Sequence, residues 1–268
     1  MTEKTLYISD LDGTLLAPGA CLTPKTVDIL GRLIDAGGLF TAATARILIG
    51  LNLLDLSGVK WNVPFVLGNG SMLYDMSRRK VVETRALSPD TIRRVLDICA
   101  GYGKTPLLYQ VHADEVMGVS TGVTSEGERA FMDKRNTRFP GCIRILPAYE
   151  PETGGFYFSM QDTREKMEAL AAALRDVPGI QTVVYRDVYM ENNWFMEIFH
   201  AGAGKDAAMR SLRERLGATR VVAFGDNLND LPMLKAADVA CVVANGLPEA
   251  KAQADEVIGG NDEDGVAM

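Results

Sequence analysis

The stretch that decides the fold is Leu6-Tyr7-Ile8-Ser9-Asp10-Leu11-Asp12-Gly13-Thr14. Its apolar start is too short for a helix and predicts a buried strand. Two carboxylates, Asp10 and Asp12, follow this strand, and Gly13 lets the backbone turn sharply toward a ligand. In open α/β sheets, the carboxyl ends of strands face the crevice where ligands bind. The stretch is therefore suited to a nucleophile with an acid–base partner, or to an oxygen-binding cation such as Mg²⁺.

Two simpler interpretations of this stretch can be compared with the catalytic one. A surface turn fits, because Asp and Gly are common turn residues. A calcium-binding loop needs Gly at about its sixth position and Glu at about its twelfth. Counted from Asp10, Gly13 is fourth and Cys21 is twelfth, which excludes that loop. On this stretch alone, a turn and a catalytic site remain equally open.

Composition narrows the function classes. The chain has 268 residues, 47% hydrophobic and 24% charged, as in a globular protein of one large or two ordinary domains. Its net charge of −7 disfavours nucleic acid as a partner but allows a small anionic substrate. Four scattered cysteines without a CxxC pair argue against a disulfide framework or a zinc site. The sequence shows neither a signal-peptide pattern nor a membrane span, so we expect a cytoplasmic protein, either a monomer or a homo-oligomer.

Hydrophobic periodicity predicts a doubly wound, Rossmann-like parallel sheet in two parts of the chain. Between the two parts, strands are longer and alternate, which indicates an inserted α+β unit with a largely antiparallel sheet. We expect the core to comprise residues 1–76 and 191–268, and the inserted unit to comprise 77–190. Core helices are predicted over 24–35, 204–216 and 229–237, and core strands over 6–8, 39–43, 64–67, 195–199, 220–224 and 239–243.

Three further polar sites follow predicted core strands. The Thr44 hydroxyl could donate to a phosphoryl oxygen, or could cap a helix over 46–54. Lys205 lies at a helix start, where a cation opposes the helix dipole, and this suggests a compensating anion. It does not belong to a nucleotide-binding P-loop, because Phe199 and Asp206 replace the required Gly and Ser or Thr. In the third site, residues 225–230, two carboxylates could bracket a metal or cap a helix; they are Asp226 and Asp230.

Taken in order, these motifs resemble those of the haloacid dehalogenase superfamily. The inserted unit resembles the cap of its Cof-type, subclass IIB phosphatases, and Asn69-Gly70 and residues 261–266 fit that subfamily too. Asn69-Gly70 equally fits a tight turn. Two positions depart from the family pattern: Ala45 stands where Gly is usual between Thr44 and Arg46, and Asp206 follows Lys205 where Gly is typical.

The resemblance implies a Mg²⁺-dependent phosphatase acting on small phosphate monoesters such as sugar phosphates. It assigns the nucleophile to Asp10 and the general acid and base to Asp12. Electrostatics agrees, since two unit charges 4 Å apart repel by about 4 kcal/mol at an effective dielectric of about 20, and a divalent cation relieves this. The metal would be held by Asp10, the Asp12 backbone carbonyl, Asp226 and Asp230, and the phosphoryl oxygens by Thr44, Lys205 and Asn229. The cap would close over the substrate and set specificity.

Two other functions fit parts of this pattern. A phosphomutase of the phosphomannomutase type would use the same core and a similar cap to move phosphate between two hydroxyls of one sugar. A phospho-accepting regulator would also use an acidic cluster with Thr and Lys. Receiver domains, however, are only about half this length, and they need neither Asp12 as an acid nor a cap.

Overall fold

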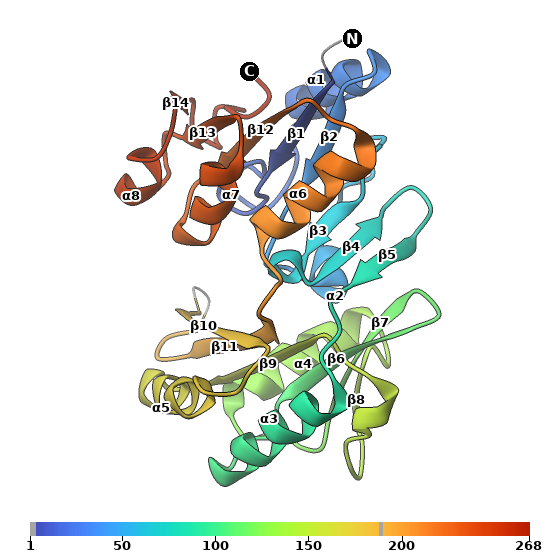
Figure 1. Ribbon diagram of the computed structural model, residues 1–268, viewed down its shortest axis with the longest axis vertical. Helices are drawn as coiled ribbons and strands as arrows, with labels where there is room; N and C mark the ends of the chain where they lie inside the picture. Colours follow the sequence, from blue (N-terminus) through green and yellow to red (C-terminus); the bar gives the residue numbers. More distant parts are fainter. Residues whose placement is uncertain (1–3, 188–189) are drawn as a thin grey trace. The chain divides into compact units, whose positions relative to one another are not determined.

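The computed structural model describes residues 4–187 and 190–268, which form two compact units (Figure 1). The core unit comprises Met1–Glu83 and Ala203–Met268, and the inserted unit comprises Thr84–Gly202. A parallel sheet lies in the first and a largely antiparallel sheet in the second, which confirms the predicted fold class. Within the described residues, the helices are all too short or too polar to cross a membrane.

The core sheet has five parallel strands in the order β14-β13-β12-β1-β2. In its register, Ser9 at the end of β1 pairs with Phe224 of β12 and with Ala42 of β2. The carboxyl ends of three strands therefore meet at one edge, where the polar loops follow. The strands are β1 (Thr5–Ser9), β2 (Leu39–Ala42), β12 (Arg220–Gly225), β13 (Val239–Val243) and β14 (Glu256–Ile258).

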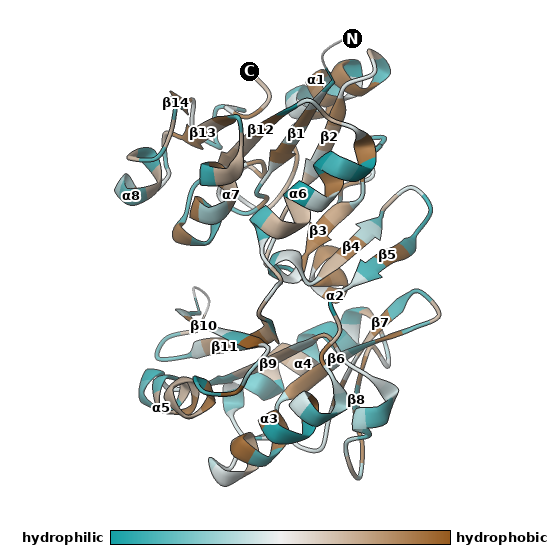
Figure 2. Cartoon of the chain, in the orientation of Figure 1, coloured by the Kyte–Doolittle hydropathy of each residue, from teal (hydrophilic) through white to brown (hydrophobic). Residues whose placement is uncertain are grey.

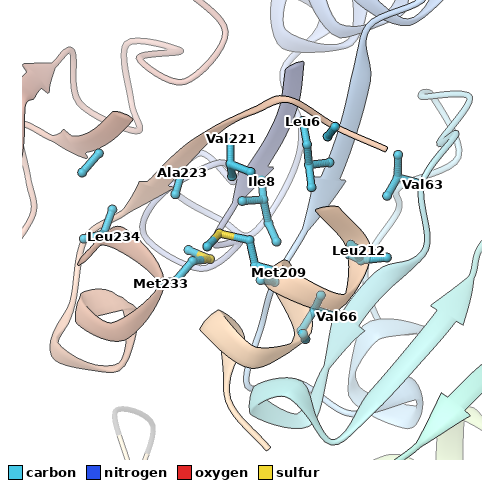
Figure 3. Packing of buried hydrophobic residues seen from close by; sticks show 14 of the residues in the cluster. Leu6, Ile8, Val63, Val66, Met209, Leu212, Val221, Ala223, Met233 and Leu234 are labelled. Carbon is cyan, nitrogen blue, oxygen red and sulfur yellow. The ribbon is translucent and has the colours of Figure 1, made fainter. Parts of the chain in front are cut away.

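Apolar side chains of two helices cover one face of this sheet. Met209 and Leu212 of α6 (Lys205–Leu216) pack in one cluster with Ile8 (Figure 3). The same cluster receives Met233 and Leu234 from α7 (Leu231–Ala236). Figure 2 shows the matching hydropathy, brown along β1 and teal on exposed turns of α6. A smaller cluster, containing Val222, Phe224 and Cys241, uses the alternate positions of β12 and β13.

Local signals define the remaining core elements. The helix α1 (Pro24–Asp35) begins as predicted, with Thr23 as its N-cap accepting from the Thr26 N–H. The predicted strand 64–67 forms β3 (Phe65–Leu67), which meets the residue after β2 through the isolated bridge Ala43↔Val66 and is not a strand of the five-stranded sheet. It instead pairs in a three-stranded sheet with β4 (Met72–Asp75) and β5 (Lys80–Thr84). Short helices complete the unit: α2 (Leu48–Leu51), α8 (Pro248–Lys251) and the one-turn η1 (Gly68–Gly70) and η3 (Leu228–Asp230).

The inserted unit contains a six-stranded sheet in the order β10-β11-β9-β6-β7-β8, antiparallel except for the pair β7–β8. Apolar residues of α3 and α5 form a core with strand residues such as Phe158 and Ile198. The strands are β6 (Leu107–His112), β7 (Glu115–Ser120), β8 (Ile143–Ile145), β9 (Tyr157–Asp162), β10 (Ile180–Arg186) and β11 (Trp194–His200). The helices are α3 (Pro89–Gly101), α4 (Glu126–Arg138), α5 (Arg164–Leu174) and the one-turn η2 (Pro151–Thr153).

Both boundaries between the two units lie later in the sequence than predicted. The expected limits at 76/77 and 190/191 become 83/84 and 202/203. At the first limit, β5 pairs with β4 of the core unit. At the second, β11 was expected in the core sheet but pairs with β9 and β10. An apolar strand pattern shows that a strand will be buried and does not specify its partner, which explains the second shift. The first shift has another cause, since the half-exposed β5 has no such pattern and pairs with β4.

A buried carboxyl group in the inserted unit, that of Glu197, is expected to make stability depend on pH. Burial raises the pKa of Glu197 to about 7, although the phenols of Tyr157 and Tyr185 act in the opposite direction. A raised carboxyl pKa favours the folded state at low pH, and this contribution is lost as pH rises through the folded pKa. We therefore expect Glu197→Gln to match the wild type at pH 4, below the unfolded pKa, and to exceed its free energy of unfolding at pH 8 by about 3 kcal/mol, since one pKa unit corresponds to about 1.4 kcal/mol.

Urea unfolding of this variant can be followed by Trp194 fluorescence in a Trp61→Phe background, because the chain has 2 tryptophans. The exposed Glu165 of α5 offers a control, and Glu165→Gln should leave the pH profile unchanged. A loss of stability for Glu197→Gln that is equal at both pH values would contradict the expectation.

Candidate active site

The carboxyl edge of the core sheet collects side chains from distant parts of the sequence. Asp10 directly follows β1, Thr44 follows β2, and Asp226 follows β12. Lys205 is the first residue of α6, and its side chain is only 1% exposed. The structure thus brings these four predicted site residues to one edge of one unit.

Three carboxylates form a tight group at this edge. Asp10, Asp226 and Asp230 each offer an oxygen, and these oxygens lie within 4.8 Å of one another. The Lys205 Nζ donates to Asp10 Oδ1 at 2.5 Å and to Asp230 Oδ1 at 2.7 Å. Three carboxylates and one ammonium sum to two negative charges when all are ionised. The oxygen-only donor set and this excess charge fit a divalent cation such as Mg²⁺.

The carboxyl groups of the cluster and Lys205 shift the pKa values of one another. Burial raises the pKa of Asp10 to about 8; Lys205 acts against this shift, while Asp230 and Asp226 add to it. Burial also raises the pKa of Asp226. For Lys205, burial favours the neutral amine, but the adjacent Asp10 and Asp230 carboxylates raise its pKa, so it stays charged. Asp10 therefore retains a proton at neutral pH, while Lys205 carries its positive charge.

Backbone amides orient one carboxylate of the cluster. Asp230 Oδ2 accepts from the N–H groups of Asp226 and Asn227, both at 3.0 Å. Asp230 is fully buried, and its remaining oxygen faces Lys205. The bond from the Asn227 N–H is one half of a capping box at the start of η3, whose other half is a backbone N–H bond accepted by the Asn227 side chain. Asp230 thus both caps a helix and belongs to the acidic cluster, so the two interpretations of this motif are compatible.

The turn after β1 approaches Asp226 closely. Gly13 has a φ of 83°, and a Cβ there would lie 2.8 Å from Asp226 Oδ2. A side chain is therefore excluded by both conformation and space. The next residue, Thr14, donates from Oγ1 to Asp226 Oδ1 at 2.8 Å. Thr14 had no role in the sequence analysis, because a hydroxyl after a turn gives no signal of its long-range partner.

Asp12 lies outside the three-carboxylate group. Both of its carboxylate oxygens accept from the Arg46 guanidinium, from Nε and Nη2, each at 2.7 Å. The side chain of Asp12 is 46% exposed, in contrast to the buried Asp10. Sequence reasoning noted Arg46 only as part of the Thr44 motif and did not predict this pair. The described arrangement holds the Asp12 carboxylate in a bidentate ion pair away from the cluster.

The last two predicted phosphate-binding residues have different surroundings. Thr44 is buried, and its Oγ1 accepts from the Arg46 N–H at 3.1 Å. The helix expected over 46–54 is shorter, because α2 spans only Leu48–Leu51. Asn229 is exposed in the one-turn helix η3, next to Asp230.

Comparison with known proteins agrees with this geometry. Residues 7–268 match the family described as haloacid dehalogenase-like hydrolase. The chain belongs to this family. The predicted resemblance is therefore confirmed over almost the whole chain.

Its curated relatives are phosphatases. Pyridoxal phosphate phosphatase YbhA of Escherichia coli is 27% identical over 280 residues, covering 100% of this chain and 97% of that protein. The HMP-PP phosphatase of Yersinia enterocolitica is 28% identical, covering 96% of this chain and 91% of that protein. A haloacid dehalogenase-like hydrolase structure from Bacteroides thetaiotaomicron has a TM-score of 0.79 at 22% identity, covering 99% of this chain and 97% of that one. The chain is thus a phosphatase-type member of the haloacid dehalogenase-like hydrolases.

Proposed function

We propose that this protein is a Mg²⁺-dependent phosphatase that hydrolyses small phosphate monoesters through an aspartyl-phosphate on Asp10. The observation that carries the proposal is the buried group of Asp10, Asp226 and Asp230 around Lys205. A purely structural cluster would be expected to pair each buried carboxylate with a cation, because unpaired buried charge is costly. Here one lysine faces two of three carboxylates, which supports a site for a divalent cation and an anionic substrate.

The metal would be held by Asp10, Asp226 and the Asp12 backbone carbonyl, with Asp230 in support. Bound there, Mg²⁺ would supply charge neutralisation and fix the alignment of the phosphoryl group. Asp230 is engaged by two backbone amides and Lys205, so it acts mainly by orienting its neighbours. The bond from Thr14 keeps Asp226 facing the Asp10 loop.

The reaction we propose uses Asp10 as the nucleophile. Its carboxylate forms a bond to phosphorus while the bond from phosphorus to the substrate oxygen breaks. Asp12 gives a proton to that leaving oxygen and later takes one from the water that hydrolyses the acyl phosphate. Lys205, Thr44 and Asn229 hold the phosphoryl oxygens, and positive charge at this point stabilises the transition state.

For Asp12 to serve as the acid, its pair with Arg46 must open. The guanidinium binds both Asp12 oxygens, so the carboxyl group is held toward Arg46 while this pair is closed. A phosphate dianion competes well for such a planar guanidinium. Substrate binding is therefore expected to release Asp12, which would limit acid catalysis to the loaded enzyme.

The choice of substrate is proposed to lie in the inserted unit. All the residues assigned above to phosphoryl transfer belong to the core unit. The relatives named above act on pyridoxal phosphate and HMP-PP, which supports a phosphorylated metabolite as substrate here. Substitutions in the inserted unit should therefore reorder substrate preference while hydrolysis of a small aryl phosphate persists.

Metal removal tests this function. A panel of phosphorylated metabolites is incubated with the protein, and free phosphate is measured with chelator, with Mg²⁺ and with Ca²⁺. We expect no turnover in chelator, full recovery with Mg²⁺, and inhibition by Ca²⁺, whose larger and looser coordination disturbs in-line attack. Full activity in chelator would refute the metal site.

The same assay predicts a pH dependence. The raised pKa of Asp10, about 8 without metal, means that metal binding must displace a proton below that pH. The Mg²⁺ concentration for half-maximal activity should therefore fall as pH rises toward 8 and level off above it. A requirement for Mg²⁺ that is constant from pH 6 to pH 9 would contradict this coupling.

A further inference from the structure

Residues 259–265, which we call the C-terminal segment, are fastened to the loop that follows β1. The Asn261 side-chain amide donates to the Leu16 carbonyl at 2.8 Å. The Asn261 backbone N–H donates to Asn245 Oδ1 at 2.9 Å, and Asn245 Nδ2 donates to the Gly13 carbonyl at 2.8 Å. The two asparagines thus form a continuous bridge that holds both ends of residues 13–16.

This bridge ends beside the acidic cluster. Between its two anchor carbonyls lies Thr14, which donates to Asp226. The loop that carries Asn245 also supports Asp226 directly, because the Leu247 N–H donates to the Asp226 carbonyl at 2.8 Å. A connected network of hydrogen bonds therefore links the two asparagines to the Asp226 carboxylate, to the Asp226 backbone and to the turn that contains the Asp12 carbonyl.

The C-terminal segment is itself held firmly. Asp264 accepts from the Thr26 hydroxyl at 2.9 Å and from the Thr23 hydroxyl. These contacts tie it to the start of α1. Gly265 lies so close to Gly259 that a Cβ on it would be 1.9 Å from the Gly259 carbonyl oxygen. The segment can adopt this fold only with glycine at 265.

The bridge is expected to contribute little to the stability of the fold. Asn245 is exposed, so water competes for both of its hydrogen bonds and their net contribution to folding is small. Its two hydrogen bonds nevertheless fix the Gly13 carbonyl relative to the Asn261 N–H. Partners one step removed from metal-binding groups commonly have this effect on affinity and activity.

We propose that Asn245 and Asn261 are positioning residues, through which the C-terminal segment sets the geometry of the Asp12–Asp226 side of the active site. The inference rests on the proposed function for its effect on metal binding, but the bridge itself can be tested without metal. Neither residue contacts a reacting group, so each acts only through the loop that it holds.

The test compares Asn245→Ala, Asn261→Ala and Gly265→Ala with the wild type. Gly265→Ala keeps both asparagines but displaces the C-terminal segment from its present fold. This variant therefore shows whether the position of Asn261, and not only its side chain, is required. The first readout is amide hydrogen exchange of residues 11–17 in the metal-free protein, which should become faster in all three variants. The second is the Mg²⁺ concentration that gives half of the Mg²⁺-induced rise in melting temperature, which should increase at least about tenfold.

A matched control is present in the same unit. Asn62 bridges a loop at the opposite edge of the sheet, donating to the Gly38 carbonyl at 2.7 Å and accepting from the Phe40 N–H at 3.2 Å. Asn62→Ala should leave the exchange of residues 11–17 and the Mg²⁺ requirement unchanged.

Wild-type exchange and wild-type Mg²⁺ affinity in all three variants would overturn the proposal. A wild-type protein whose melting temperature does not respond to Mg²⁺ would instead overturn the proposed function. In that case the exchange measurement would still decide whether the bridge holds the loop.

Discussion

Asp10→Asn is expected to abolish both turnover and formation of a phosphoenzyme. The variant keeps the shape of the side chain but removes the nucleophilic carboxylate oxygen, for which the neighbouring Asp226 and Asp230 cannot substitute from their own positions. Asn also replaces a carboxyl group whose charged form is disfavoured by burial, so the free energy of unfolding should not fall. Intact mass after incubation with an acyl phosphate, together with free-phosphate release, gives both measurements.

Asp12→Asn supplies the comparison for this prediction, because it should fail at a different step. It retains the backbone carbonyl and loses only the transferable proton, so turnover should drop by at least about a hundredfold. An acyl phosphate needs no proton on its leaving group, so this variant should become phosphorylated and then stall. Phosphoenzyme on Asp10→Asn, or near-normal turnover by Asp12→Asn, would show that the assigned roles are wrong.

Lys205→Met is expected to damage both stability and activity. The ammonium group contacts two carboxylates and is buried with them. Removing it leaves these charges unpaired, which should lower the free energy of unfolding of the metal-free protein by about 3–5 kcal/mol at pH 8. The loss should shrink at lower pH, where the carboxyl groups protonate. Phosphoryl transfer should fall by about 10² to 10³, because a group that stabilises developing charge is lost.

The exposed Lys235 of α7 provides the control for charge alone. Lys235→Met removes one positive charge from the same unit, and it should change neither the pH profile of stability nor the rate. Chemical denaturation between pH 5 and pH 9, with and without Mg²⁺, tests the pair. If Lys205→Met were as stable as Lys235→Met at pH 8, the buried ion pairs of Lys205 would not stabilise the folded protein as predicted.

Local sequence was sufficient for the fold class and for the residues at the sheet edge. The run Leu6-Tyr7-Ile8 is apolar and short, and it forms β1, in which Leu6 and Ile8 are buried and Tyr7 is partly buried. Likewise Thr23 capped α1 as expected, since capping depends on neighbours three residues away. Parallel strands bring their carboxyl ends together, so the predicted order of motifs already placed Asp10, Thr44 and Asp226 at one edge.

Tertiary structure decided what depends on partners far apart in sequence. The apolar pattern of β11 was clear, but its pairing with β9 and β10 followed from the inserted sheet. The Asp12–Arg46 pair spans 34 positions, and the Asn245–Gly13 bond spans 232. Polar side chains carry no periodic signal of such partners, because a hydrogen bond depends on atoms meeting within about 3 Å after the chain has folded.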